Sequence, residues 1–182
     1  MKDIDGIHKV LEILEPHWHE IEEDFERNNQ RFLRLADADH NFIGRILKAH
    51  LVIENFLNTF LSSHYGIEEI DDIKLSFIQK AKLLPTRDSS AAFVRPGILQ
   101  LNSIRNKFGH RLNHEIMQHE ISAIYEALAV ARRGVHFASP IEAIEAFAPI
   151  ACAFLSVQPP HLKHLFAAAF KNVHSHTPES NG

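Results

Sequence analysis

The sequence has little of what builds β-sheets and little that cross-links a chain. Among its 182 residues there are seven glycines and a single cysteine, Cys152. Val and Thr are also scarce, and because β-branched residues are a main strand signal, their scarcity favours helices. One cysteine excludes an internal disulfide and a multi-cysteine zinc site within one chain. The composition therefore predicts an all-α protein of a reducing compartment, the cytoplasm.

The sequence also lacks a long hydrophobic run. Residues 1–6 do not combine a basic segment with a following apolar core, so we expect no signal peptide. The most apolar stretch, 143–157, is interrupted by Glu145 and Pro149. It is shorter than the roughly 18 to 20 residues that span a bilayer. We therefore expect no membrane anchor.

The charges are distributed unevenly along the chain. Apolar residues make up 45% and charged residues 23%, as in an ordinary globular domain, and the net charge is −4. Residues 1–26 hold nine acidic and two basic residues, whereas 74–111 hold eight basic residues and one acid, Asp88. This basic block suits a ligand that carries phosphate, or else forms a solvated helix face; the charges alone leave both open.

Apolar spacing predicts a succession of helices. They are expected over residues 2–15, 17–35, 40–64, 73–84, from 96 or 97 to 109, over 114–133, from 140 onward, and over 159–172. Five residues of the second helix are expected to face inward: Trp18, Ile21, Phe25, Phe32 and Leu35. The third helix is the longest and carries the widest apolar stripe, so we expect neighbours on more than one of its sides. Residues 86–95 read as a surface loop.

Helix ends and domain limits follow from local signals. Gly66 and Gly134 suit left-handed helix ends, and Ser139 suits an N-cap. We expect a helical bundle over residues 1–138, a C-terminal helical appendage over 139–172 packed on the same domain, and a disordered tail over 173–182.

Residues 101–112, Leu-Asn-Ser-Ile-Arg-Asn-Lys-Phe-Gly-His-Arg-Leu, carry the most suggestive chemistry. Arg105 offers a permanent cation with a planar donor fork, and His110 can exchange a proton near neutral pH. Cleaving RNA through its own 2′-hydroxyl needs such a proton acceptor and a cation on the phosphate. On a continuous helix these two side chains diverge by about 140°. We expect the helix to break at Gly109, which lets the chain turn His110 back toward Arg105.

Two polar residues interrupt the third helix one turn apart, His50 and Glu54. They either support an active site from beneath or form a hydrogen-bonded pair partly in solvent.

The chain has fourteen histidines, which could indicate a metal site, but their spacings do not favour one. His114 and His119 are five residues apart, so they diverge by about 140° on a helix and cannot share one ion. His110 and His114 have a suitable spacing but no evident third ligand. We expect no metal and no cofactor.

The motif Arg105-Asn106-Lys107-Phe108-Gly109-His110 resembles the signature of the HEPN superfamily, an arginine followed by a polar residue and, four to six residues on, a histidine. The resemblance covers roughly residues 40–133. It implies an up-and-down helical bundle that dimerises with two motifs facing one cleft. Many members are metal-independent endoribonucleases, often toxins or defence proteins, and others are scaffolds. The chain has Leu112 where the toxin subgroup carries tyrosine. Size and helix pattern also resemble, more loosely, the mannitol-repressor family of bacterial regulators.

The resemblance assigns roles to individual residues. Arg105, Asn106 and His110 match the catalytic positions, Lys107 and Arg111 are expected to grip the RNA backbone, and His50 and Glu54 to support them. The expected partners are a second copy of the chain, RNA, and a cognate antitoxin or regulatory protein. Two alternatives stay open: a non-catalytic regulatory or binding module, and a purely structural role in which Arg105 pairs with an acid such as Glu54 and His110 caps a helix.

Overall fold

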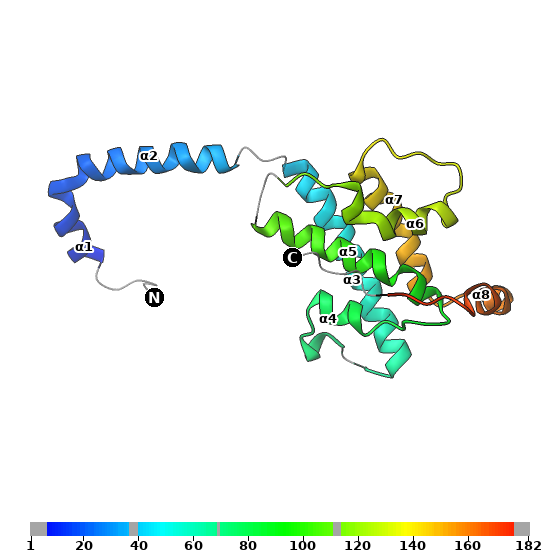
Figure 1. Cartoon of the computed structure of the whole chain (residues 1–182). Helices are drawn as coiled ribbons and strands as arrows, with labels where there is room; N and C mark the ends of the chain where they lie inside the picture. The colour runs from blue at the N-terminus through cyan, green and yellow to red at the C-terminus, as the bar shows by residue number, and fades with distance from the viewer. Residues whose placement is uncertain (1–6, 37–39, 69, 111–113, 177–182) are drawn as a thin grey trace. The chain divides into compact units, whose positions relative to one another are not determined.

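The computed structural model describes residues 7–36, 40–68, 70–110 and 114–176, and these are mainly helical (Figure 1). No β-strand occurs among them; Arg87 and His174 form an isolated antiparallel bridge. The predicted all-α class is confirmed. The chain divides into two compact units, residues 1–38 and 39–182.

The first unit consists of α1 (Ile7–Leu14), a 3₁₀ turn (Glu15–His17) and α2 (Trp18–Ala36). Pro16 lies in the first turn of the 3₁₀ segment, where its missing N–H leaves no helical acceptor unmatched. Trp18 is 43% exposed and Phe25 is 59% exposed. The prediction that these two side chains face inward is therefore wrong, because one amphipathic helix has no second layer of its own to cover them.

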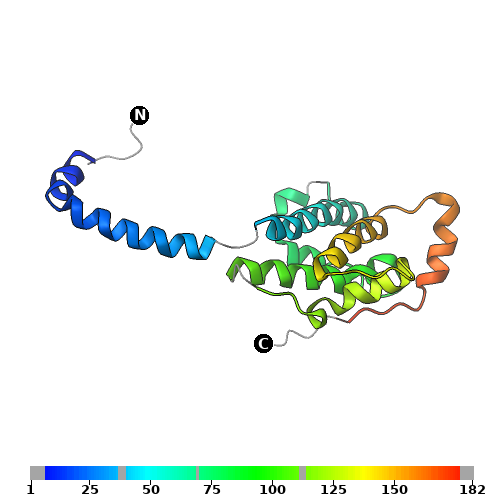
Figure 2. The ribbon, with the colours of Figure 1, turned by 90° about the horizontal axis from the view of Figure 1, so that it is seen from above.

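The second unit is a helical bundle. Its helices are α3 (His40–Tyr65), α4 (Phe77–Lys82), α5 (Ser90–His110), α6 (Ser122–Ala131), α7 (Pro140–Leu155) and α8 (Lys163–Phe170), with 3₁₀ turns at Ile70–Ile73, Gln118–Ile121 and Pro160–Leu162. α3 packs against α4, α5 and α7, and α7 also packs against α5 and α6 (Figures 1 and 2). The wide stripe of α3 thus does meet neighbours on more than one side.

The bundle core is aliphatic with one central aromatic ring. Its largest fully buried side chains are Ile46, Ile53, Leu57, Leu61, Ile98, Leu101, Ile104, Ile121, Ile124, Leu128, Ile144 and Phe147. Since Ile144 and Phe147 belong to α7, this helix contributes to the core of the second unit. The compact units divide between residues 38 and 39, and none of their limits falls at residues 138 and 139, because α7 packs against α3, α5 and α6.

Several helix ends follow their local signals. Ser139 Oγ accepts a hydrogen bond from the Glu142 backbone N–H at 3.4 Å, which confirms the predicted N-cap of α7. Gly66 and Gly134 adopt φ of 67° and 77°, the left-handed conformation that terminates a helix at little steric cost to glycine.

The start of α5 and the C-terminal segment depart from prediction. α5 begins at Ser90 and contains Pro96, so residues 90–95 are not loop; buried Ala91, Ala92 and Val94 hold this turn against the core. Residues 173–176 are not a free tail. The Asp88 N–H donates to the Val173 carbonyl and the Ser175 N–H to the Thr86 carbonyl, each at 2.9 Å. The remaining predicted tail, 177–182, lies outside the described residues.

Among the described helices, none is by itself long and apolar enough to cross a membrane. Residues 140–155 and 160–170 reach that length and composition only as a pair, which is bent by 93°.

Candidate functional site

The Arg105–His110 motif occupies the last turns of α5, a helix fixed firmly to the bundle. Ile98, Leu101 and Ile104 are fully buried, and Phe108 is 5% exposed. At Gly97 the contact with α7 is so close that a Cβ would lie 2.6 Å from Phe147 Cζ. The backbone that carries the motif is thus positioned by core packing on the opposite side of the helix.

α5 does not break at Gly109, so that prediction is wrong. The helix continues to His110, and Gly109 does not adopt a positive φ. The physical reason is Phe108, whose ring packs 5.5 Å, centroid to centroid, from both Phe42 and His114 and keeps the last turn helical. Along a continuous helix, positions 105 and 110 point about 140° apart. One chain therefore does not bring this arginine and histidine to the same point by a turn at Gly109.

Arg105 and Asn106 lie exposed on the surface of α5. Arg105 Nη1 donates a hydrogen bond to Asn106 Oδ1 at 3.3 Å. This contact restrains the guanidinium at the helix surface. The side chain of His110 and the whole of Arg111 lie outside the described residues.

Lys107 lies beside a carboxylate. Its Nζ forms an ion pair with Glu120 Oε1, while Glu120 Oε2 accepts from the Met117 N–H at 2.8 Å and lies 3.2 Å from His114 Nε2. Burial raises the pKa of Glu120, but the bonds from Lys107 and Met117 and the charge of His114 outweigh it and hold the pKa below its ordinary value. Glu120 therefore ties the end of α5 to the segment before α6.

His50 lies beneath Arg105, between α3 and α5. Its side chain is buried, stacks on Phe77 with ring centroids 3.7 Å apart, and hydrogen-bonds to Asn102. Burial lowers its pKa; the bond to Asn102 and the charge of Glu54 oppose this, and the charge of Arg105 adds to it. His50 is therefore a neutral imidazole at neutral pH. Its Nε2 has no hydrogen-bond partner within the described part of the chain.

Glu54 pairs with Lys80 of α4 and not with Arg105. The Lys80 Nζ lies 2.9 Å from Glu54 Oε1, and the two side chains are 8% and 26% exposed. Glu54 is therefore not the acid that pairs with Arg105, and the expected helix cap by His110 falls on a side chain outside the described residues. We call His50, Glu54, Lys80 and Asn102 the polar layer; it separates the core from the surface that carries Arg105.

Sequence reasoning singled out His50 and Glu54 but missed Lys80 and Asn102. The sequence position of each omitted residue could have identified it as a buried polar residue. Asn102 lies one turn after Ile98 on the apolar stripe of α5, and Lys80 lies one turn after buried Phe77 on α4. A polar residue inside an apolar stripe calls for a buried partner, since an unsatisfied buried polar group is destabilising.

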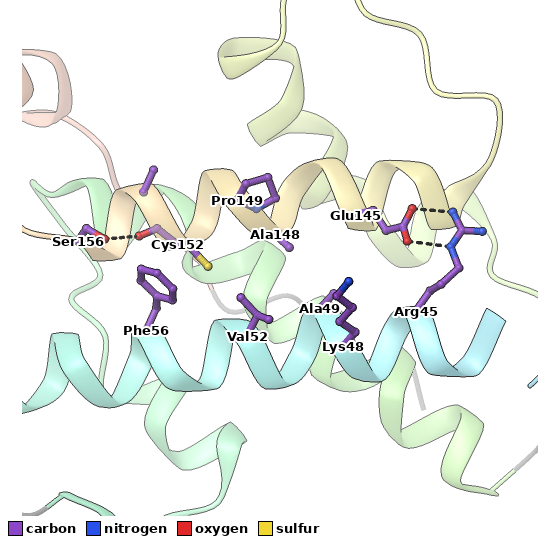
Figure 3. Close-up of a pocket in the computed structure, with 11 residues that line it drawn as sticks. Arg45, Lys48, Ala49, Val52, Phe56, Glu145, Ala148, Pro149, Cys152 and Ser156 are labelled. Carbon is purple, nitrogen blue, oxygen red and sulfur yellow. Dashed lines mark hydrogen bonds and ion pairs between the residues drawn. The ribbon is translucent and has the colours of Figure 1, made fainter. Parts of the chain in front are cut away.

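A groove lies on another face of the bundle. It has a volume of about 600 Å³, runs between α3 and α7, and has an apolar floor that includes Val52, Phe56 and Cys152 (Figure 3). At one end Arg45 makes a bidentate ion pair with Glu145, at 2.8 and 2.6 Å. Val52 and Phe56 are each two positions from the polar-layer residues of α3, about 200° around the axis. The groove and the motif therefore lie on opposite sides of that helix.

No protein-family model, no curated protein and no solved structure matches this chain. Within the described ranges no three His, Cys, Asp or Glu side chains are grouped so that they could hold a metal ion. The resemblance to the HEPN superfamily therefore depends on the motif and its place at the end of a helix.

Proposed function

We propose that this chain is a HEPN-like, metal-independent endoribonuclease that acts as a homodimer in the cytoplasm, as a toxin or defence component. The observation that carries the proposal is Arg105, an exposed guanidinium on a rigid helix, restrained by Asn106 and placed above the buried, neutral His50. A fixed donor fork of this kind is suited to the phosphate whose charge grows in the transition state.

The helical geometry of α5 favours a composite site. Because positions 105 and 110 diverge by about 140° on a continuous helix, a phosphate held by Arg105 of one chain is best reached by His110 of the other. His110 takes the proton of the 2′-hydroxyl, whose oxygen attacks the adjacent phosphorus. The bond to the 5′-oxygen breaks, and that oxygen gains a proton from water. The products are a 2′,3′-cyclic phosphate and a 5′-hydroxyl.

The first experiment is cleavage of total RNA by the purified protein in EDTA. Arg105→Ala and His110→Ala should each abolish cleavage, because one removes the phosphate cation and the other the proton acceptor. The matched controls are Arg132→Ala and His136→Ala, which alter exposed residues of the same types outside the motif and outside the 3₁₀ turn that packs on α5. Equal cleavage by all five proteins would refute the assignment.

A second experiment tests the composite site. Mixing the two inactive variants produces mixed dimers in which one site regains both Arg105 and His110. After free exchange of subunits, about a quarter of the wild-type activity should return, since half the dimers are mixed and each has one intact site. If each chain used its own pair, no activity would return.

The alternative function is a non-catalytic regulatory or binding module, similar to the mannitol-repressor family. The contact between Lys107 and Glu120 favours it, because a lysine next to the motif is engaged in an internal ion pair. A module of this type leaves RNA uncut in every version of the protein. Growth on induction separates the two functions further: a ribonuclease toxin arrests growth, and Arg105→Ala or His110→Ala restores it.

A further inference from the structure

The N-terminal unit carries a strict heptad pattern. Apolar residues recur at alternating intervals of four and three, interrupted only by Asn28. These positions, which we call the seam, are Ile7, Leu11, Leu14, Trp18, Ile21, Phe25, Asn28, Phe32 and Leu35. In the sequence the seam spans four successive heptads, and in the structure the chain bends at the 3₁₀ turn Glu15–His17, so α2 carries the uninterrupted part from Trp18 to Leu35 (Figures 1 and 2).

A seven-residue repeat of this length has a specific structural meaning. A straight α-helix drifts by about 20° per heptad relative to a 3.5-residue repeat, which amounts to about 50° over the part of the seam that lies on α2. A helix packed against a globular core has no need to maintain such a repeat. A helix that supercoils with another helix must keep it, because otherwise the apolar side chains leave the interface.

The described seam side chains of α2 that flank its first two turns lie together on one face. Trp18 and Phe25, seven residues apart, lie edge to face with ring centroids 6.5 Å apart, although they are 43% and 59% exposed. Ile21 lies between them and is half-buried. Isolated helices in water are marginally stable, and most helices gain their stability by packing an apolar face. α2 therefore presents two large aromatic rings on a face that a partner helix would cover.

We propose that the partner is a second copy of the same segment, paired in parallel and in register as a two-stranded coiled coil. Asn28 is the one polar position of the seam, and its Nδ2 donates a hydrogen bond to Asp24 Oδ2 at 2.9 Å on the same helix. In register, each Asn28 faces Asn28 of the other chain, so that the two amides lie together within the seam, as polar seam residues do when they specify register. Against an apolar partner position, the amide would keep only its bond to Asp24 and would set its remaining polar groups against apolar side chains, which is destabilising.

The charges agree with parallel pairing. The unit is strongly acidic, yet Glu12, Glu20, Glu23 and Glu26 all fall on the outer faces of the repeat. The residues that would face each other beside a parallel seam are Val10 with Glu15, His17 with Glu22, Asp24 with Asn29, and Arg31 with Ala36, so no two like charges meet.

This self-association is independent of the proposed ribonuclease site, because it uses α1 and α2 and not α5. A cross-linking experiment on the full chain tests it. Asn28→Cys places two thiols opposite each other at the seam, within the range of Cα separations that a disulfide spans. Gln30→Cys, at an outer position of the same helix, is the matched control. The native Cys152 does not interfere, because it is buried and burial raises its pKa to about 11.

With oxidised glutathione, the Asn28→Cys protein should run at twice its mass on a non-reducing gel, and the Gln30→Cys protein should stay monomeric. Adding Ile21→Asp and Phe25→Asp to the Asn28→Cys protein should abolish the cross-link, whereas His19→Asp with Gln30→Asp should leave it. Arg105→Ala and His110→Ala should not change it. Absence of the residue-28 cross-link, or equal cross-linking at residues 28 and 30, would overturn the proposal.

Discussion

The ion pair between Glu54 and Lys80 offers a quantitative test of the polar layer. Glu54→Gln leaves the Lys80 ammonium, whose side chain is only 8% exposed, without its counter-charge. Breaking a buried pair by removing one partner costs roughly 3 to 5 kcal/mol. Because Glu54 is 26% exposed and water screens part of the interaction, we expect the lower end, about 3 kcal/mol.

Replacing Lys80 instead of Glu54 should reduce the free energy of unfolding by less. Lys80→Met keeps the volume and removes the buried charge, while Glu54 can still reach water, so we expect a loss of about 1 kcal/mol. The double variant, Glu54→Gln with Lys80→Met, should lie within about 1 kcal/mol of wild type, because neither charge is left buried alone. The two single effects should therefore not add.

Urea unfolding measures these differences, and the sequence provides an internal control. The only tryptophan is Trp18, which lies in the N-terminal unit, whereas most helices of the bundle report through far-UV circular dichroism. The Glu54→Gln change should lower the dichroism midpoint and leave the tryptophan fluorescence midpoint in place. Equal effects of the two single changes, or additivity in the double variant, would show that Lys80 is not a buried charge held by Glu54.

Three further predictions concern single positions. Because burial lowers the pKa of His50, the unfolded state binds more protons than the folded state below about pH 6.5. The free energy of unfolding should therefore decrease as the pH is lowered below that value, by at most about 1.4 kcal/mol per pH unit. In urea titrations at several pH values, His50→Gln should make this dependence on pH less steep. Gly97→Ala forces a methyl group against Phe147 and should destabilise the bundle by about 1 to 3 kcal/mol in calorimetry, whereas Gly44→Ala, with open space around it, should be neutral or stabilising. Arg95 buries Nε and Nη1 without a hydrogen bond in the described chain, so Arg95→Met should raise the free energy of unfolding by about 1 to 3 kcal/mol.

Local signals predicted those features that depend on a few neighbouring residues. The span of α3, the N-cap at Ser139 and the left-handed ends at Gly66 and Gly134 were all predictable, because each follows from apolar periodicity or from the conformational freedom of one residue. The break predicted at Gly109 did not occur, because a local signal of this kind only permits a structure. Glycine allows a turn but does not require one, and the packing of Phe108 extends the helix past Gly109.

The candidate site was predictable in composition but not in its pairings. The sequence identified Arg105, Asn106, Lys107, His50 and Glu54 as polar residues near one helix end. The partner with which each of these side chains forms an ion pair or hydrogen bond depends on how α3, α4 and α5 pack, because the partner residues are far apart in the sequence. Glu54 meets α4 and Lys107 meets the segment before α6.

The sequence by itself determined that this protein is helical, where most helices begin and end, and that one basic segment holds an arginine and a histidine suited to phosphate chemistry. These properties are encoded within a few turns of chain. Only the tertiary structure decided that α7 belongs to the core, that α5 stays continuous through Gly109, and that Lys80 takes the partner expected for Arg105. Those outcomes depend on contacts between distant segments, where burial energy outweighs local preference.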